Sequence, residues 1–315
     1  MPNPLIPQEI YLLERYSSAE YFKLLWDAFA ATVQAAEDGL AEVMRTLPPD
    51  YRRRPRWQQP DITWGTVVLP NFRDTLQMIE EAYLALLGGE CSAIGVAGNV
   101  NTAFAGQGRD YPYDWMPEPY ATKFDEASVL ASRYASNIAF TDQIGWVWGD
   151  LTTRYSEIDF GPLAPPLTWP IYRLNPKVRV ATDEEIPVTG VYLPDADEAS
   201  AQFFCAGTYA TDASTGYDPK TTQNIDDVHT TWTLVERVAD SGGGTGCGPQ
   251  GTSEASRNRP NVPANQPCSE TGWWFTAAKP DSRRWFKQGE TMPSVGGDYG
   301  QTFWQWSPDQ SAPKL

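Results

Sequence analysis

The sequence is poor in the residues from which most metal and nucleophilic sites are built. Its 315 residues include one histidine, His229, and four cysteines, at positions 91, 205, 247 and 268, with no C-x-x-C pair. A zinc site normally draws its ligands from cysteine and histidine, and a serine or cysteine nucleophile needs a positioned base. We therefore expect no metal, no cofactor and no catalytic triad, and we expect that the chain is not an enzyme.

Long apolar runs are missing as well. No segment approaches the roughly 20 apolar residues that cross a bilayer, and the first ten residues, "MPNPLIPQEI", lack the cationic start and apolar stretch of a secretory signal. These features predict a cytoplasmic protein without a membrane contact. Free thiols are the expected state of cysteine in a reducing compartment, and a bridge between Cys247 and Cys268 stays open as the alternative.

Positive charge is scarce. The chain has 24 Lys and Arg against 40 Asp and Glu, which gives a formal net charge of −16. Such a balance repels nucleic acid and anionic lipid, and it favours a basic partner. Four arginines, Arg52, Arg53, Arg54 and Arg56, gather in a proline-rich connection at 48–65. We expect a solvated face there, with a nucleic-acid contact as the alternative.

The first half carries helical periodicity. Apolar residues at steps of three and four predict an amphipathic helix over residues 17–47, which starts at Ser17 with Glu20 three positions later. The same spacing predicts a helix over 72–86, followed by Gly88 and Gly89. It also predicts a third long helix in the segment 125–155, which starts at Asp125 and ends near Gly149. Residues 90–123 show no clear period, so we expect a loop with short helical pieces.

The second half reads as strands. From residue 162, dense turn residues separate short β-branched and aromatic runs: "KVRVA", "IPVTGVYL", "AQFF", "HTTWTLVERV", "GWWFTAA" and "QTFWQW". The sequence thus predicts an α+β fold with two domains. Residues 1–161 are predicted to form a bundle of three or more helices, and residues 162–315 are predicted to form a mainly antiparallel, aromatic-rich β domain. Residues 239–270 are too poor in apolar side chains to bury themselves and are predicted to be a long flexible loop.

Aromatic and cationic residues meet in "TGWWFTAAKPDSRRWFKQGETMP", residues 271–293. Adjacent residues of a strand point to opposite faces, so Trp273 and Trp274 cannot form one stacking platform. Arg283 and Arg284 lie beside Trp285 and suit stacking of a guanidinium on an aromatic ring. The pattern favours a structural use, with a sugar-binding surface or a protein-binding hot spot as alternatives.

Three segments carry a family resemblance: "TGVYLPDADEASAQFF" (189–204), "TTWTLVERV" (230–238) and the stretch from "TGWWFT" to "WQW" (271–306). In this order, after a helical half, they resemble large immunity proteins of bacterial polymorphic toxin systems, in the families numbered seventy-one and seventy-two. The resemblance implies a protein made by the same locus as a toxin delivered by contact-dependent or type VI secretion. It also implies inhibition by binding, without catalysis.

Charge and resemblance together predict an immunity protein that binds a basic cognate toxin domain and occludes its active site or blocks a required motion. Eight acidic residues are the candidate partner-binding residues: Asp183, Glu184, Glu185, Asp195, Asp197, Glu198, Asp226 and Asp227. One alternative is a carbohydrate-binding or carbohydrate-active protein that uses tryptophan surfaces, with carboxylate pairs from the same clusters. Another is an effector chaperone or assembly factor of a secretion system. The sequence does not predict an oligomeric state.

Overall fold

The computed structural model describes residues 4–166, 169–238, 262–276, 282–294 and 303–306. The described chain divides into two compact units, one up to Glu236 and the other from Arg237 onward. The predicted α+β class is confirmed, because several packed helices are followed by antiparallel sheets with aromatic clusters. Helices give way to strands between Phe160 and Tyr172, and the first sheet belongs to the same compact unit as the helices. The predicted loop at 239–270 lies outside the described residues as far as position 261, and Cys247 lies there too.

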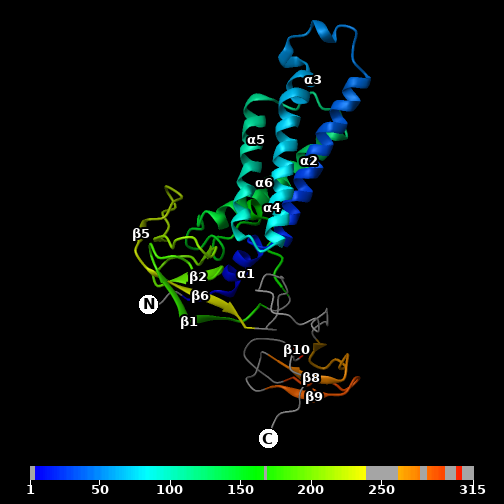
Figure 1. Ribbon diagram of the computed structural model, residues 1–315. Coiled ribbons are helices and arrows are strands. Elements are labelled where there is room, and N and C mark those ends of the chain that lie inside the picture. Colours follow the sequence, from blue (N-terminus) through cyan, green and yellow to red (C-terminus); the bar gives the residue numbers. More distant parts are fainter. Residues whose placement is uncertain (1–3, 167–168, 239–261, 277–281, 295–302, 307–315) are drawn as a thin grey trace. The chain divides into compact units, whose positions relative to one another are not determined.

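Four long helices form the body of the first unit and lie side by side (Figure 1). They are α2 (Ala19–Arg45), α4 (Leu69–Leu87), α5 (Gly98–Asp110) and α6 (Tyr120–Asp142). Their inward faces bury large side chains completely, among them Phe22, Phe29, Phe72 and Ile138. Removing each such side chain from water contributes about 1.5–3 kcal/mol, so the bundle interior is the main stabilising element of this unit. The shorter helical elements are α1 (Pro7–Tyr16), η1 (Tyr51–Arg53), η2 (Arg56–Gln58), α3 (Pro60–Thr63), η3 (Trp64–Val68), η4 (Cys91–Ala97) and α7 (Glu157–Phe160).

The start of the first long helix differs from the prediction by one residue. Ser18, and not Ser17, caps α2, because its side-chain oxygen accepts a hydrogen bond from the backbone N–H of Tyr21 at 3.1 Å. Ser17 instead follows the end of a separate helix, α1, which the periodicity did not separate. The helix predicted over 72–86 is confirmed as α4, with Gly89 in the left-handed region at φ +91°.

Two further predictions in the helical half are wrong. Residues 98–110 were expected to belong to a loop with short helical pieces, but they form one helix of 13 residues, α5. Val100 and Ala103 are buried against the bundle, and this packing outweighs the low helix propensity of glycine. The third predicted helix ends at Asp142 rather than near Gly149. Ile144 takes φ +56° and the N–H of Gly145 bonds to the carbonyl of Phe140, which turns the chain out of the helix.

A four-stranded sheet separates two cores within the first unit. Its order is β1 (Tyr172–Ala181), β6 (Thr231–Arg237), β2 (Gly190–Pro194) and β3 (Gln202–Phe204), and β2 pairs antiparallel with β6 and β3. Val191 and Leu193 face the core that the helices share, whereas Tyr192 faces a second core with Phe204 and Trp232. Helix α1 contacts β2 and β3, so the helical core continues onto the sheet. A hairpin of β4 (Ala213–Thr215) and β5 (Asp226–Val228) adds Ala213 to the second core.

The second unit has its own four-stranded sheet. Its order is β7 (Val262–Pro263), β10 (Phe303–Trp306), β8 (Gly272–Phe275) and β9 (Arg284–Phe286), with antiparallel pairing. Trp274 is fully buried and Trp273 only half-buried, as the alternation predicts. The guanidinium of Arg283 lies 4.6 Å from the ring centre of Trp273, and that of Arg284 lies 4.8 Å from the ring of Trp304. The predicted stacking of guanidinium groups on aromatic rings is therefore observed, while the choice between a structural and a binding use stays a prediction.

The cysteines correct a further prediction. Cys91 and Cys205 form a disulfide across a sequence separation of 114 residues, whereas free thiols were expected. Their spacing gave no sign of this pairing, since only the packing of η4 near the end of β3 brings them together. Cys268 is a free, buried thiol whose Sγ lies 3.0 Å from the carbonyl oxygen of Glu270. None of the helices in the described part of the chain combines the length and the apolarity that a membrane crossing requires.

Candidate functional site

All eight acidic residues predicted to bind a partner are exposed to solvent. Three of them follow β1, three follow β2, and the last two belong to β5 rather than to a turn. Their role in binding stays a prediction. The structure does add one observation about them, which is that the three clusters lie together.

Backbone hydrogen bonds join the three acidic clusters. The N–H of Thr182, after β1, donates to the carbonyl of Thr230, and the N–H of Asp195, after β2, donates to the carbonyl of Thr231, both at 3.0 Å. The segments that follow β1 and β2 therefore meet where β6 begins. The cluster after β2 also reaches the hairpin, because the carbonyl of Glu198 accepts the N–H of Gly216 at 2.8 Å.

Figure 1 shows β5 and the loops around it at one end of this sheet. We call this region the acidic end, defined by the eight predicted residues together with Asp212. Two basic side chains lie close to it. A guanidinium nitrogen of Arg179 is 3.9 Å from an oxygen of Asp195, and Nδ1 of His229 is 3.3 Å from Oδ1 of Asp212. The nine carboxylates of the acidic end outnumber these two basic groups, so the acidic end stays negative.

A cavity of about 320 Å³ opens within the acidic end. Its lining residues come from the end of α6, from β3, from β6 and from the β4–β5 hairpin, and they include Gln143, Gln202, Asp212, Ser214, Asp227 and Trp232. Among them, Gln202 and Trp232 are buried, with exposed fractions of 3% and 1%. Most of the lining is polar, which distinguishes this cavity from a gap in a hydrophobic core.

Two residues of this lining each carry a buried acceptor that has no hydrogen-bond partner within the described part of the chain. The two acceptors are Oε1 of Gln202 and Oδ1 of Asp212. The distance from Oδ1 of Asp212 to Nδ1 of His229 suits an ion pair when the imidazole is protonated, but the geometry is not that of a hydrogen bond, so we treat this oxygen as an open acceptor. A buried acceptor without a partner costs roughly 1–3 kcal/mol, and such groups are rare in folded proteins.

Three donors around the same cavity are already engaged. Nε2 of Gln202 donates to the carbonyl of Trp146 at 2.7 Å, and Nε1 of Trp232 donates to the carbonyl of Thr211 at 2.7 Å. The hydroxyl of Ser214 donates to Oδ1 of Asp227 at 2.7 Å. The cavity therefore offers acceptors and negative charge to whatever enters it.

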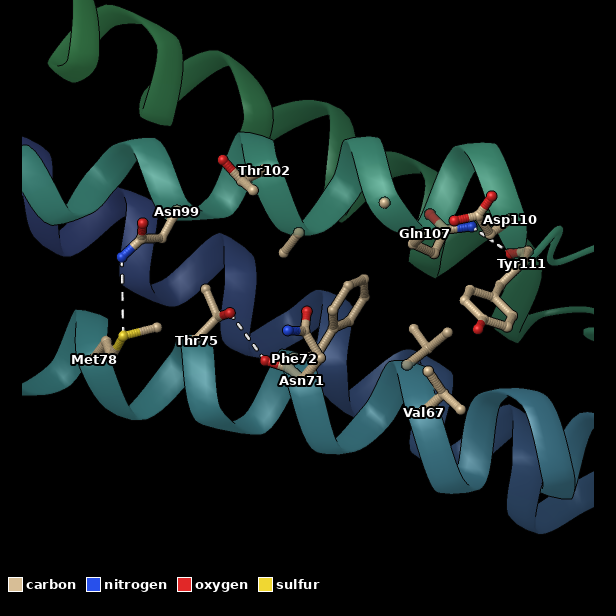
Figure 2. A pocket seen from close by; sticks show the side chains of 13 residues that line it. Val67, Asn71, Phe72, Thr75, Met78, Asn99, Thr102, Gln107, Asp110 and Tyr111 are labelled. Atoms are coloured by element: carbon tan, nitrogen blue, oxygen red, sulfur yellow. Dashed lines mark hydrogen bonds between the residues drawn. The ribbon is translucent and has the colours of Figure 1, made fainter.

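A larger hollow, of about 380 Å³, lies between α4 and α5 (Figure 2). Its polar side chains bond to near neighbours. Thr75 donates to the carbonyl of Asn71, and Gln107 donates to the carbonyl of Tyr111. The carboxylate of Asp110 pairs with the adjacent Arg109. This arrangement presents no group in need of a ligand.

Sequence reasoning missed Gln202 and Asp212. Gln202 was assigned only to a strand, and Asp212 stands alone between uncharged residues in "YATDAST". A solitary acidic residue in a turn-rich stretch carries no signal. Nothing in the sequence indicates that the fold would bury one oxygen of each side chain in a shared cavity.

The described residues contain no group of three or more His, Cys, Asp or Glu side chains arranged to hold a metal ion. Exposed tryptophans are present, among them Trp57, Trp148 and Trp285, which lie on three separate segments of the chain. The acidic clusters, by contrast, are joined by backbone hydrogen bonds, so the acidic end is the better-defined candidate.

No protein-family model, curated protein or solved structure matches this chain.

Proposed function

We propose that the protein is an immunity protein that binds a basic toxin domain at the acidic end of its first sheet and neutralises it without catalysis. The observation that carries this proposal is the gathering of three exposed acidic clusters around one end of a sheet by backbone hydrogen bonds. The resemblance of three segments to polymorphic-toxin immunity proteins supports the same class.

The mechanism is steering followed by occlusion. Like charges held together by a rigid backbone produce a directed field, which raises the rate of encounter with a basic domain by about 10- to 1000-fold at low ionic strength. The acidic end is anchored by strand pairing, and the residues around it are ordered by the Tyr192, Phe204 and Trp232 core. A binder that is rigid before contact loses less conformational entropy on association. Covering the active site of the toxin, or blocking a motion that the toxin needs, then prevents its activity.

The compartment belongs to the same proposal. The sequence favours the cytoplasm, whereas the Cys91–Cys205 disulfide favours an oxidising compartment, because disulfides persist there and are reduced in the cytoplasm. We propose that the protein meets its toxin in an oxidising compartment such as the bacterial periplasm. Alkylation of free thiols in fractionated cells tests this point, and it is overturned if Cys91 and Cys205 react without prior reduction.

The experiment for the function is charge reversal with one substitution in each cluster: Glu185→Lys, Asp195→Lys and Asp226→Lys. The triple variant is compared with the unchanged chain for protection of cells that produce the polypeptide encoded beside this gene, and for the salt dependence of binding to that polypeptide. We expect protection to be lost and the association rate to fall at least about tenfold at low salt.

The matched control reverses three exposed carboxylates on the helices, Asp74→Lys, Glu80→Lys and Glu126→Lys. It changes the net charge equally and leaves the acidic end intact. Equal losses in both triple variants would mean that only net charge matters. If the acidic-end variant still protects fully, and its salt dependence is unchanged, the acidic end is not the interface.

A further inference from the structure

We infer that the cavity in the acidic end is a binding site for a guanidinium group, and that it receives an arginine side chain of the partner. The inference deepens the proposed function, on which it rests for the source of the arginine. The cation site itself does not depend on the proposed function, because its evidence comes from the residues of the cavity alone.

The cavity contains a buried polar side chain whose acceptor is unused. Gln202 is 3% exposed, its Nε2 is bonded to the carbonyl of Trp146, and its Oε1 has no partner among the described residues. Oδ1 of Asp212 is the second such acceptor in the same lining. Two acceptors left open in one cavity are satisfied together by a ligand that carries several donors.

The required ligand is cationic. Asp212 and Asp227 bring two carboxylates to the lining, and the nearest imidazole, that of His229, is largely exposed and bears charge only when protonated. The donors of Gln202, Trp232 and Ser214 are engaged within the protein, so the side-chain donors that remain for an anion are those of the exposed Gln143 and Thr211. Gln143, which is exposed, is the remaining amide in the lining and can turn its oxygen inward.

A metal ion fits this set poorly. Calcium takes six to eight oxygen ligands and magnesium demands a near-octahedral set, whereas the lining supplies two carboxylates and one open amide oxygen. A guanidinium fits better, since it is planar, has five N–H donors and is more weakly hydrated than an ammonium group. Trp232 adds an apolar wall, which a flat, weakly hydrated cation tolerates. A volume of about 320 Å³ leaves room for the side chain that carries the guanidinium.

Titration of the full chain with arginine amide tests this site directly, and it needs no toxin. The indole N–H signal of Trp232 is followed by NMR while affinity is measured by calorimetry. We expect saturable binding of arginine amide, weaker binding of lysine amide, and none of citrulline amide, which keeps the shape but lacks the charge. Asp212→Asn and Asp227→Asn should each weaken arginine amide at least about tenfold, because each removes a charge-assisted hydrogen bond.

The matched controls are Asp74→Asn and Asp218→Asn, which change exposed or half-exposed carboxylates outside the cavity lining and should leave the affinity unchanged. Thermal unfolding checks that each variant is folded. The site is overturned if arginine amide does not bind at tens of millimolar, or if binding ignores both cavity substitutions. Equal binding of lysine amide would overturn the guanidinium assignment.

This outcome is separable from that of the charge-reversal experiment. If arginine amide binds in the cavity while the charge-reversed protein still protects cells, the cation site stands and the proposed interface fails. If charge reversal abolishes protection while arginine amide does not bind, the interface stands and the arginine site fails.

Discussion

The acidic end and the arginine-rich connection between α2 and α3 are both exposed and charged, with opposite signs. The connection lies at the far end of the bundle from the sheet (Figure 1). Some of its positive charges form ion pairs within the connection: Arg52 pairs with Asp61 at 2.7 Å, and Arg54 lies 3.9 Å from Asp50. The acidic end instead surrounds a cavity with two open acceptors. Charges that pair with one another within a segment are therefore weak evidence for a site, and clustered charges around unsatisfied buried groups are stronger evidence.

Among the changes that test this contrast, removal of the Cys91–Cys205 disulfide should have the largest effect on stability. Cys205 lies three residues after Gln202, so the bridge to Cys91 holds one wall of the cavity against the helices. For a closed loop of this length, its loss should lower the free energy of unfolding by about 2–5 kcal/mol. We expect the Cys91→Ser, Cys205→Ser double variant to unfold at lower urea concentration and to bind arginine amide more weakly.

The control for the disulfide is the reductant itself. Reductant should shift the urea midpoint of the unchanged chain and leave that of the double variant where it is. A midpoint of the unchanged chain that does not respond to reductant would show that the bridge is not formed in solution. The arginine-rich connection contains no cysteine, so its Arg52–Asp61 pair should be insensitive to the same treatment.

The second prediction concerns the pH dependence of stability, in which the buried carboxyl group of Glu9 should differ from the exposed carboxylates of the acidic end. Glu9 of α1 is 4% exposed and bonds to Ser200 and to the backbone of Ala201, just before Gln202. Burial raises the pKa of Glu9 from 4.5 to about 7, although both hydrogen bonds oppose the rise.

The sign of this linkage follows from the raised pKa. The protonated carboxyl is favoured in the folded state, so its contribution to stability is complete below pH 4.5 and is lost as pH rises through about 7. The loss amounts to about 3 kcal/mol above that pH. Glu9→Gln should therefore unfold at higher urea concentration than the unchanged chain at about pH 8, with the difference shrinking toward about pH 5. Glu184→Gln, at an exposed carboxylate, is the control; an equal gain there would contradict the assignment to burial.

How much of this could be predicted from the sequence depends on the range of the interactions. The helix over 72–86, the α+β class and the opposite facing of Trp273 and Trp274 follow from local periodicity and alternation, and all were confirmed. Helix α5 was missed because its stability comes from the burial of Val100 and Ala103 against distant helices and not from its own glycine-rich composition.

The candidate site divides in the same way. The acidic residues could be named from the sequence because exposure and charge are properties of single positions. The cavity could not be predicted from the sequence. Gln202 is buried only because β3 packs near Trp146, whose carbonyl accepts its hydrogen bond and which lies 56 positions earlier in the chain. Which acceptor then lacks a partner depends on the complete three-dimensional arrangement, and no spacing of residue types encodes it.

The smallest predicted effect concerns the arginine-rich connection. Asp61 accepts hydrogen bonds from the hydroxyl of Tyr51 and from Arg52. Burial alone would raise the pKa of Asp61, but these bonds and the charge of Arg52 hold it below its usual value of 3.8. The carboxylate thus contributes stability above that pH, and the contribution is lost as pH falls through the lowered pKa. Asp61→Asn should cost about 1 kcal/mol at neutral pH and progressively less in acid, measured by urea unfolding.

The same variant tests whether the connection acts only within itself. Asp61→Asn should leave the affinity for arginine amide and the protection of cells unchanged, because its contacts are confined to the connection and the start of α3. Arg53→Glu and Arg56→Glu, which reverse two exposed charges beside Trp57, should likewise alter neither. If either arginine substitution abolished protection, the arginine-rich connection would be part of the interface. The arginine-rich connection, with its internal ion pairs, and the acidic end would then both bind the partner. The contrast between the two regions would fail, whatever the cavity binds.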